Sequence, residues 1–174
     1  GKEYYSNVSS TKEILFARRT ASSNTFEGYN FPVGYSSGQG GNCPTQDLVD
    51  AFECTDGKSI SESPLYDAND PYANRDPRLA KTVVVNGEAW PNDLAAYNSE
   101  YPTIETYVGG YHSRTGNAAG KSYATTTGYY LKKFCNPDQI LRARSGVAVT
   151  TSPHGWLTFR MAVSYTHLTL PTKL

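Results

Sequence analysis

Two phrases decide the fold, PTQDLVDAFECTDGKSI from Pro44 to Ile60 and YDANDPYANRDPRLAKTVVVNG from Tyr66 to Gly87. The first phrase predicts a helix that begins at Pro44 and Thr45, because proline suits the first turn and Asp47 and Asp50 lie near the favourable N-terminal end. Asp56-Gly57 predicts the end of this helix, since glycine readily adopts the left-handed conformation found there.

The second phrase predicts a sharp succession of local structures. Asp76 can cap a single helical turn begun by Pro77. The β-branched run from Thr82 to Val85 then favours an extended strand. Asn86-Gly87 is the dipeptide most typical of a tight hairpin turn.

Weaker signals predict the remaining elements. A short helix is expected over Lys12 to Arg18, an irregular loop over residues 20–43, and a helix that begins near Trp156. Extended segments are expected at Thr103 to Val108 and from Tyr111 onward, joined by Gly109-Gly110, and again at Thr125 to Phe134. The sequence therefore predicts a mixed, loop-rich chain with short helices and a few short antiparallel strands.

These phrases, taken in order with KEILFARRT (Lys12 to Thr20), NFPVGYSSGQGGNCPTQ (Asn30 to Gln46) and TGYYLKKF (Thr127 to Phe134), resemble the RagB/SusD family of outer-membrane nutrient-binding lipoproteins. The resemblance implies part of a mainly helical, tetratricopeptide-like SusD-type fold. It also implies capture of an oligosaccharide or other nutrient ligand at the cell surface and delivery to a TonB-dependent transporter of the SusC kind. It implies no catalysis and no cofactor, and membrane attachment only through an N-terminal lipid anchor outside this sequence.

The last residues do not continue the pattern expected of that family. WLTFRMA, which begins at Trp156, has helical spacing, whereas VSYTHLTLPTKL from Val163 to Leu174 is rich in β-branched residues and contains Pro171. This tail resembles translated sequencing-adapter read-through. We therefore expect a partial RagB/SusD domain over residues 1–162 and a non-native tail over residues 163–174, although a natural C-terminal strand is the alternative.

The composition argues against some classes of binding partner and favours others. Lys+Arg and Asp+Glu balance at 16 each, so the net charge predicts no nucleic-acid partner. The 14 tyrosines outnumber the 6 phenylalanines. Tyrosine has an apolar face and a polar tip, which suits a half-wet surface that stacks on sugar rings, although exposed packing in a loop-rich domain explains the same bias.

Several motifs have a structural explanation beside a chemical one. Gly34-Tyr35-Ser36-Ser37-Gly38 matches a nucleophile elbow, but Gln39-Gly40-Gly41 cannot form the helix that the elbow needs. The acidic loop from Asp67 to Asp76 could hold calcium, yet turns and a helix cap explain its residues.

Charged and sulfur side chains are also expected to be structural. Arg75 and Arg78, which bracket Asp76, predict an arginine-carboxylate pair that pins the loop. Cys43 and Cys54 flank a helix too long for a disulfide, which predicts free thiols. No metal site is expected.

The candidate ligand site is a group of aromatic residues interleaved with amides and carboxylates, which together suit a neutral polyhydroxylated ligand. Its members are Trp90, Tyr97, Tyr101, Tyr107 and Tyr111. Anchoring of a long loop is the structural alternative for any one ring. A glycan-degrading enzyme with a pair of carboxylates and a structural or adhesive surface module remain the alternative functions.

Overall fold

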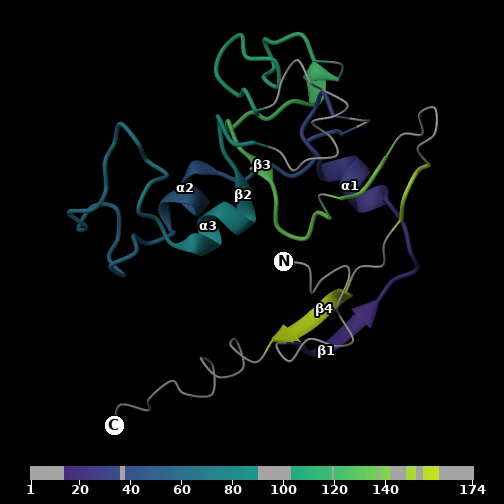
Figure 1. Ribbon diagram of the computed structural model, residues 1–174, viewed down its shortest axis with the longest axis horizontal. Helices are drawn as coiled ribbons and strands as arrows, with labels where there is room; N and C mark the ends of the chain where they lie inside the picture. The colour runs from purple at the N-terminus through teal and green to yellow at the C-terminus, as the bar shows by residue number, and fades with distance from the viewer. Residues whose placement is uncertain are drawn as a thin grey trace.

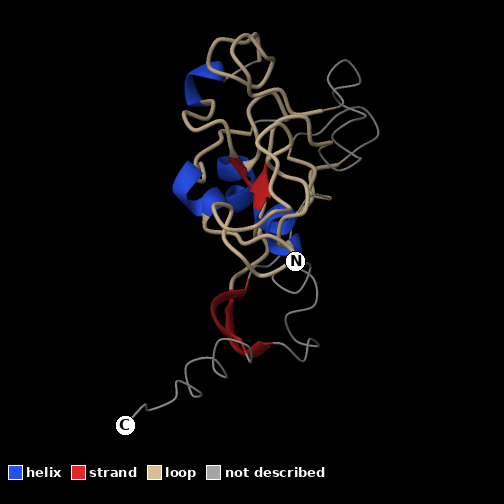
Figure 2. Ribbon diagram, turned by 90° about the vertical axis from the view of Figure 1, so that its left-hand side faces the viewer, coloured by secondary structure: helices blue, strands red, loops and turns tan. Residues whose placement is uncertain are grey.

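The computed structural model describes residues 14–35, 38–89, 103–118, 120–136, 138–141, 148–151 and 155–160. Short elements are joined by long loops, as Figures 1 and 2 show. In chain order they are β1 (Ile14–Arg19), α1 (Thr25–Asn30), α2 (Gln46–Asp50), α3 (Pro77–Thr82), β2 (Val83–Val84), the 3-10 turn η3 (Lys121–Tyr123), β3 (Tyr130–Leu131) and β4 (Gly155–Arg160). The expected loop-rich mixture of short helices and antiparallel strands is confirmed.

Two small antiparallel sheets join segments far apart in the chain. β1 pairs with β4, and β2 pairs with β3. The β1–β4 sheet lies apart from the loop-rich body in both views, whereas β2 and β3 lie within it (Figures 1 and 2). Figure 1 places α2 and α3 side by side on one flank of β2 and β3, and α1 on the other.

The helices predicted over Lys12 to Arg18 and near Trp156 are wrong, because both segments are strands. Ile14 lies opposite Arg160 and Arg19 lies opposite Gly155 in the β1–β4 pair. A single short helix is marginal on its own, so two such segments gain more backbone hydrogen bonds by pairing with each other. The apolar spacing that suggested helices is equally compatible with short strands.

The prediction of an irregular loop over residues 20–43 is wrong at α1. Thr25–Asn30 forms a helix despite a glycine and few good helix formers. Tertiary contacts hold it: Glu27 is fully buried, and its Oε1 accepts a hydrogen bond of 3.0 Å from the backbone N–H of Asn136. Packing of one helical face, rather than propensity, therefore stabilises this helix.

The helix start predicted at Pro44 and Thr45 and the cap predicted at Asp76 are confirmed. The Thr45 side chain accepts from the Leu48 N–H at 3.3 Å and opens α2, while Asp76 Oδ1 accepts from the Arg78 N–H at 2.8 Å and opens α3 with Pro77 in its first turn. α2 ends at Asp50, earlier than expected. The Asp56-Gly57 turn belongs to the following loop, where Gly57 has φ +76°.

The body is built on two buried apolar clusters. The first gathers around Phe31, Val33, Tyr35, Ile104 and Tyr130, with Val84, Ala118, Ala124 and Cys135. The second consists of Val49, Leu79, Val83 and Tyr129. Because adjacent strand residues point to opposite faces, Val83 and Val84 in β2 each supply one cluster.

The turn predicted at Asn86-Gly87 is confirmed, but the strands around it do not pair as a hairpin. The Glu88 N–H donates to Val85 O at 3.2 Å and closes the turn. β2 instead pairs with β3, which covers only two residues of the strand predicted over Thr125 to Phe134. The turn segment bonds to the later chain, where the Gly87 N–H donates to Ile104 O at 2.7 Å.

The second predicted extended pair forms a looser structure. Gly109 has φ +85°, and the Gly110 N–H donates to Tyr107 O at 2.9 Å, so the expected turn is present. His112 N–H donates to Glu105 O at 3.0 Å across it. Across residues 103–118 the pairing is limited to such isolated bonds, with no strand of regular length.

In the ranges that the structure describes, no helix has the length and apolar character to cross a membrane.

Candidate functional site

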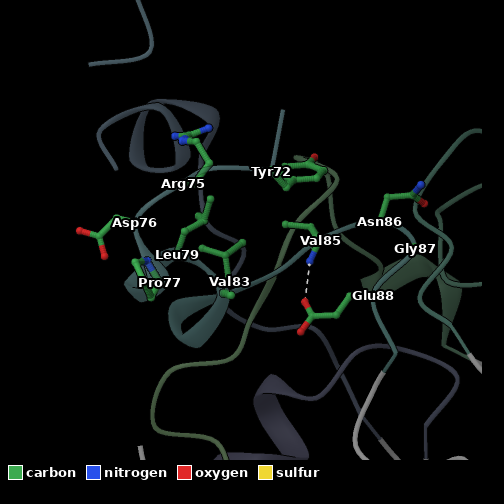
Figure 3. A pocket seen from close by; sticks show the side chains of 11 residues that line it. Tyr72, Arg75, Asp76, Pro77, Leu79, Val83, Val85, Asn86, Gly87 and Glu88 are labelled. Atoms are coloured by element: carbon green, nitrogen blue, oxygen red, sulfur yellow. Dashed lines mark hydrogen bonds between the residues drawn. The ribbon is translucent and has the colours of Figure 1, made fainter. Parts of the chain in front are cut away.

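A cavity of about 400 Å³ opens between α3, β2 and the turn after β2 (Figure 3). Its lining residues are Tyr72, Arg75, Asp76, Pro77, Leu79, Ala80, Val83, Val85, Asn86, Gly87 and Glu88. All of them come from the second deciding phrase or directly follow it. A volume of this size falls in the range of small-ligand sites.

The floor of the cavity is apolar and rigid. Leu79 and Val83 belong to the second core cluster, and Val85 packs against it. Tyr72 meets Tyr129 edge to face with ring centroids 6.4 Å apart. Burial raises the pKa of Tyr72, and the neighbouring Tyr129 hydroxyl, 3.4 Å away, acts in the same direction.

Arg75 supports one wall of the cavity from inside. Its side chain is buried, and its guanidinium donates to three backbone carbonyls, those of Pro71 (2.8 Å), Val49 (2.6 Å) and Phe52 (2.8 Å). Two of these carbonyls lie at the end of α2, where a helix leaves acceptors unsatisfied. The predicted role of pinning the loop is right for Arg75, but its partners are carbonyls and not a carboxylate.

The two carboxylates at the cavity are both engaged. Asp76 pairs with Arg78 as predicted, and this hydrogen-bonded partner lowers the pKa of Asp76 to about 2. Glu88 pairs with Lys132, while its Oε2 accepts from the Val85 N–H at 3.2 Å. A general acid of the glycosidase type needs a raised pKa, which is the reverse of the shift at Asp76.

These features suit a ligand without net charge. The floor offers apolar contact, Tyr72 offers an aromatic ring, and each rim carboxylate is neutralised by a basic partner. Asn86 adds an exposed side chain at the rim, although its Oδ1 accepts from the Thr106 N–H at 2.9 Å. The apolar floor and the paired carboxylates are compatible with a neutral molecule.

A second region of interest is the loop over residues 103–118, which carries two of the predicted ligand residues. Tyr107 lies at the turn with 56% of its side-chain surface exposed. Tyr111 is half-buried and packs edge to face on His112, with ring centroids 5.0 Å apart. The structure therefore presents Tyr107 to solvent and uses Tyr111 as an anchor.

His112 fastens this loop to the core. It is fully buried and stacks on Tyr35 with ring centroids 5.1 Å apart. Its Nδ1 accepts from the Glu105 N–H at 3.0 Å, and its carbonyl accepts from the Tyr130 hydroxyl at 2.6 Å. Burial lowers the pKa of His112 to about 4, although the Glu105 carboxylate acts in the opposite direction.

The structure does not bring the five predicted ligand residues together in one described site. Trp90, Tyr97 and Tyr101 lie outside the described residues. Tyr107 and Tyr111 are described, but neither lines the cavity. Ligand binding by this group therefore stays a prediction, and of its two described members Tyr107 is the exposed one.

The acidic loop contains a turn of the kind expected of it. In the acidic loop, Asp67 Oδ1 accepts from the Asn69 N–H at 2.8 Å, as in an Asx turn. Three or more potential metal ligands do not gather anywhere in the described ranges. Ser36 and Ser37 of the elbow-like motif lie outside those ranges.

The cysteines are free thiols, as predicted. Cys54 and Cys135 are buried and Cys43 is partly exposed. Burial strongly raises the pKa of Cys135, which keeps this thiol protonated.

Comparison with known proteins gives the family. The model of the SusD family matches residues 11–165, which is most of the chain. The chain belongs to the SusD family. No curated protein matches it.

A solved structure agrees with this SusD-family assignment at the level of the fold. The chain is similar to a SusD-like protein from Bacteroides fragilis, with a TM-score of 0.65 and 24% sequence identity. The alignment covers 94% of this chain and 33% of the Bacteroides fragilis chain. The SusD-family chain thus spans about a third of that relative's length.

The sequence reasoning missed the cavity of this SusD-family chain. The local signals were present, because Asp76-Pro77 and Asn86-Gly87 mark the helix start and the turn that bound it. Nothing in the sequence indicated that Tyr72 would lie beside Tyr129, 57 residues later. That contact depends on the pairing of β2 with β3.

Proposed function

We propose that this chain belongs to a surface lipoprotein of the outer membrane that binds oligosaccharide and delivers it to a TonB-dependent, SusC-like transporter. The observation that carries the proposal is the match of the SusD family over residues 11–165. Attachment to the membrane would occur through an N-terminal lipid anchor. The partial domain over residues 1–162 would form part of the ligand-facing region.

The described surface supports binding of a neutral ligand. Tyr107 exposes its ring on a loop that buried His112 holds to the core. A ring on a fixed support loses little conformational entropy when a sugar stacks on it. The neutralised rim of the cavity is also compatible with an uncharged ligand.

The proposal includes no turnover of the sugar. Asp76, the cavity carboxylate with a shifted pKa, is held in its ionised form by Arg78. Glu88 is occupied by Lys132 and by the backbone of Val85. Capture without cleavage therefore fits these contacts better than glycoside hydrolysis does.

Isothermal titration calorimetry against neutral oligosaccharides tests the proposal. Maltoheptaose, cellohexaose, xylohexaose and laminarihexaose cover common backbone linkages, and the wild-type chain should bind at least one of them. Tyr107→Ala and Trp90→Ala should each weaken that binding about three- to tenfold, because each removes a stacking surface.

Leu65→Ala provides the control. Leu65 is 41% exposed in the loop between α2 and α3, so its truncation removes a comparable apolar surface elsewhere. Its affinity should equal that of the wild type. Absence of binding to every sugar would count against the proposal, and equal losses in all three variants would remove Tyr107 and Trp90 from the site.

A further inference from the structure

Tyr29 presents an exposed ring at the end of α1, away from the groups considered so far. The side chain is 57% exposed and belongs to neither core cluster. An aromatic ring left this open gains little for folding, because most of its apolar surface stays in water. Its immediate surroundings give it a second, more specific feature.

The chain from Gln39 to Gly41 is fixed against the last turn of α1 by three backbone bonds. The Gln39 N–H donates to Gly28 O at 3.1 Å, the Gly40 N–H to Phe31 O at 2.9 Å, and the Gly41 N–H to Tyr29 O at 2.6 Å. These bonds satisfy carbonyls that a helix end leaves open. The segment beside Tyr29 is therefore rigid.

Glycine at position 41 is required by this close approach. A Cβ atom there would lie 2.7 Å from Tyr29 O and 3.9 Å from Tyr29 Cβ. The first distance is a steric clash with backbone, which cannot easily shift. The close approach of the two backbones beside Tyr29 therefore depends on glycine at this position.

Asn42, the next residue, is exposed and has a fixed orientation. Its Nδ2 donates to Asn30 Oδ1 at 2.6 Å, and the Nδ2 of Asn30, which is buried, donates to Phe26 O at 2.8 Å. The Asn42 amide takes part in these bonds through its NH2 group. In the described part of the chain its carbonyl oxygen receives no hydrogen bond, so an acceptor remains for an external hydroxyl.

We propose that Tyr29 and Asn42 form a binding subsite for one neutral pyranose ring of an oligosaccharide. The Tyr29 ring stacks on the C–H face of the sugar, and the Asn42 carbonyl accepts a hydrogen bond from a sugar hydroxyl. The bond from Asn42 to Asn30 and the backbone bonds of residues 39–41 to α1 fix this segment before the sugar binds, which lowers the entropy cost of binding. This subsite rests on the proposed glycan-binding function and gives it a location that does not depend on Trp90 or Tyr107.

Calorimetry with the same four oligosaccharides tests the subsite in the complete chain. Tyr29→Ala and Asn42→Ala should each weaken binding of the recognised sugar about three- to tenfold. Tyr29→Phe keeps the ring and should bind within about twofold of the wild type. Leu65→Ala, in the loop between α2 and α3, should bind as the wild type does.

The outcomes separate the subsite from the general function. If the wild type binds a sugar and both Tyr29→Ala and Asn42→Ala bind it equally well, the subsite is wrong while the proposed function stands. If the wild type binds none, both fail. Near-ultraviolet circular dichroism of each variant identifies any loss of folding. If Tyr29→Ala does not fold, Tyr29→Phe tests the stacking, since a tenfold loss of affinity in that variant would exclude it.

Discussion

Replacement of Arg75 by methionine removes a buried cation that joins two parts of the fold. The guanidinium bonds to Val49 O and Phe52 O at the end of α2 and to Pro71 O in the loop before α3. It also lies over the Tyr66 ring, 5.8 Å from its centroid. Methionine fills much of the same volume but donates to none of these acceptors.

The expected cost follows from the three lost bonds. A hydrogen bond to a charged group contributes about 1.5–3 kcal/mol, but burial of the guanidinium offsets part of the sum. We therefore expect Arg75→Met to lower the free energy of unfolding by about 3–5 kcal/mol. This is a large fraction of the roughly 5–15 kcal/mol of an ordinary domain.

Urea unfolding followed by far-ultraviolet circular dichroism measures this loss, and Arg78→Met provides the control. The Arg78 side chain is 75% exposed and pairs with Asp76. Its replacement should leave the unfolding midpoint unchanged, because exposed ion pairs contribute little. If Arg75→Met does not fold, Arg75→Lys should give an intermediate loss. Equal midpoints for the Arg75 and Arg78 variants would refute the role assigned to Arg75.

Three further predictions concern the core. Burial lowers the pKa of His112 from 6.5 to about 4 in the folded chain. As the pH falls, the unfolded state therefore binds the proton before the folded state does. Acidification from pH 6.5 to 4 should lower the free energy of unfolding by roughly 3 kcal/mol. His112→Phe should flatten this pH dependence in urea titrations; an unchanged slope would contradict it. Tyr130→Phe, which loses the bond to His112 O, should cost about 1–2 kcal/mol in the same assay, and no loss would refute that bond. Ellman's reagent should label Cys43 rapidly in native buffer and Cys54 and Cys135 only after denaturation, whereas three fast thiols would contradict the burial.

Local signals allowed the central helices to be predicted from sequence. Thr45 and Asp76-Pro77 act on amides within three residues of themselves, so the chemistry that starts α2 and α3 is readable without the rest of the fold. The Asn86-Gly87 turn is local in the same sense. The length of α2 was overestimated because Asp56-Gly57 closes a separate turn.

Long-range pairing could not be predicted in the same way. β1 is a strand because it meets β4, more than a hundred residues later, and nothing within Ile14–Arg19 indicates that partner. α1 depends on a bond from Asn136 to buried Glu27. Local propensity gives way in both places to contacts that only the tertiary structure supplies.

The candidate site follows the same division. The aromatic group was selected by composition, which cannot distinguish exposed Tyr107 from anchoring Tyr111. The cavity around Leu79 and Val83 could not be predicted without knowledge of the β2–β3 pairing. The domain boundary at residue 162 and the non-native origin of residues 163–174 stay predictions.

Equilibrium dialysis with a neutral oligosaccharide, followed by mass spectrometry of the recovered sugar, tests directly whether the chain binds a glycan without cleaving it. We expect the chain to retain at least one of the four oligosaccharides and to release it at its original length after prolonged incubation. Recovery of shortened products would show an enzyme, and equal sugar concentrations on both sides of the membrane for all four would contradict glycan binding.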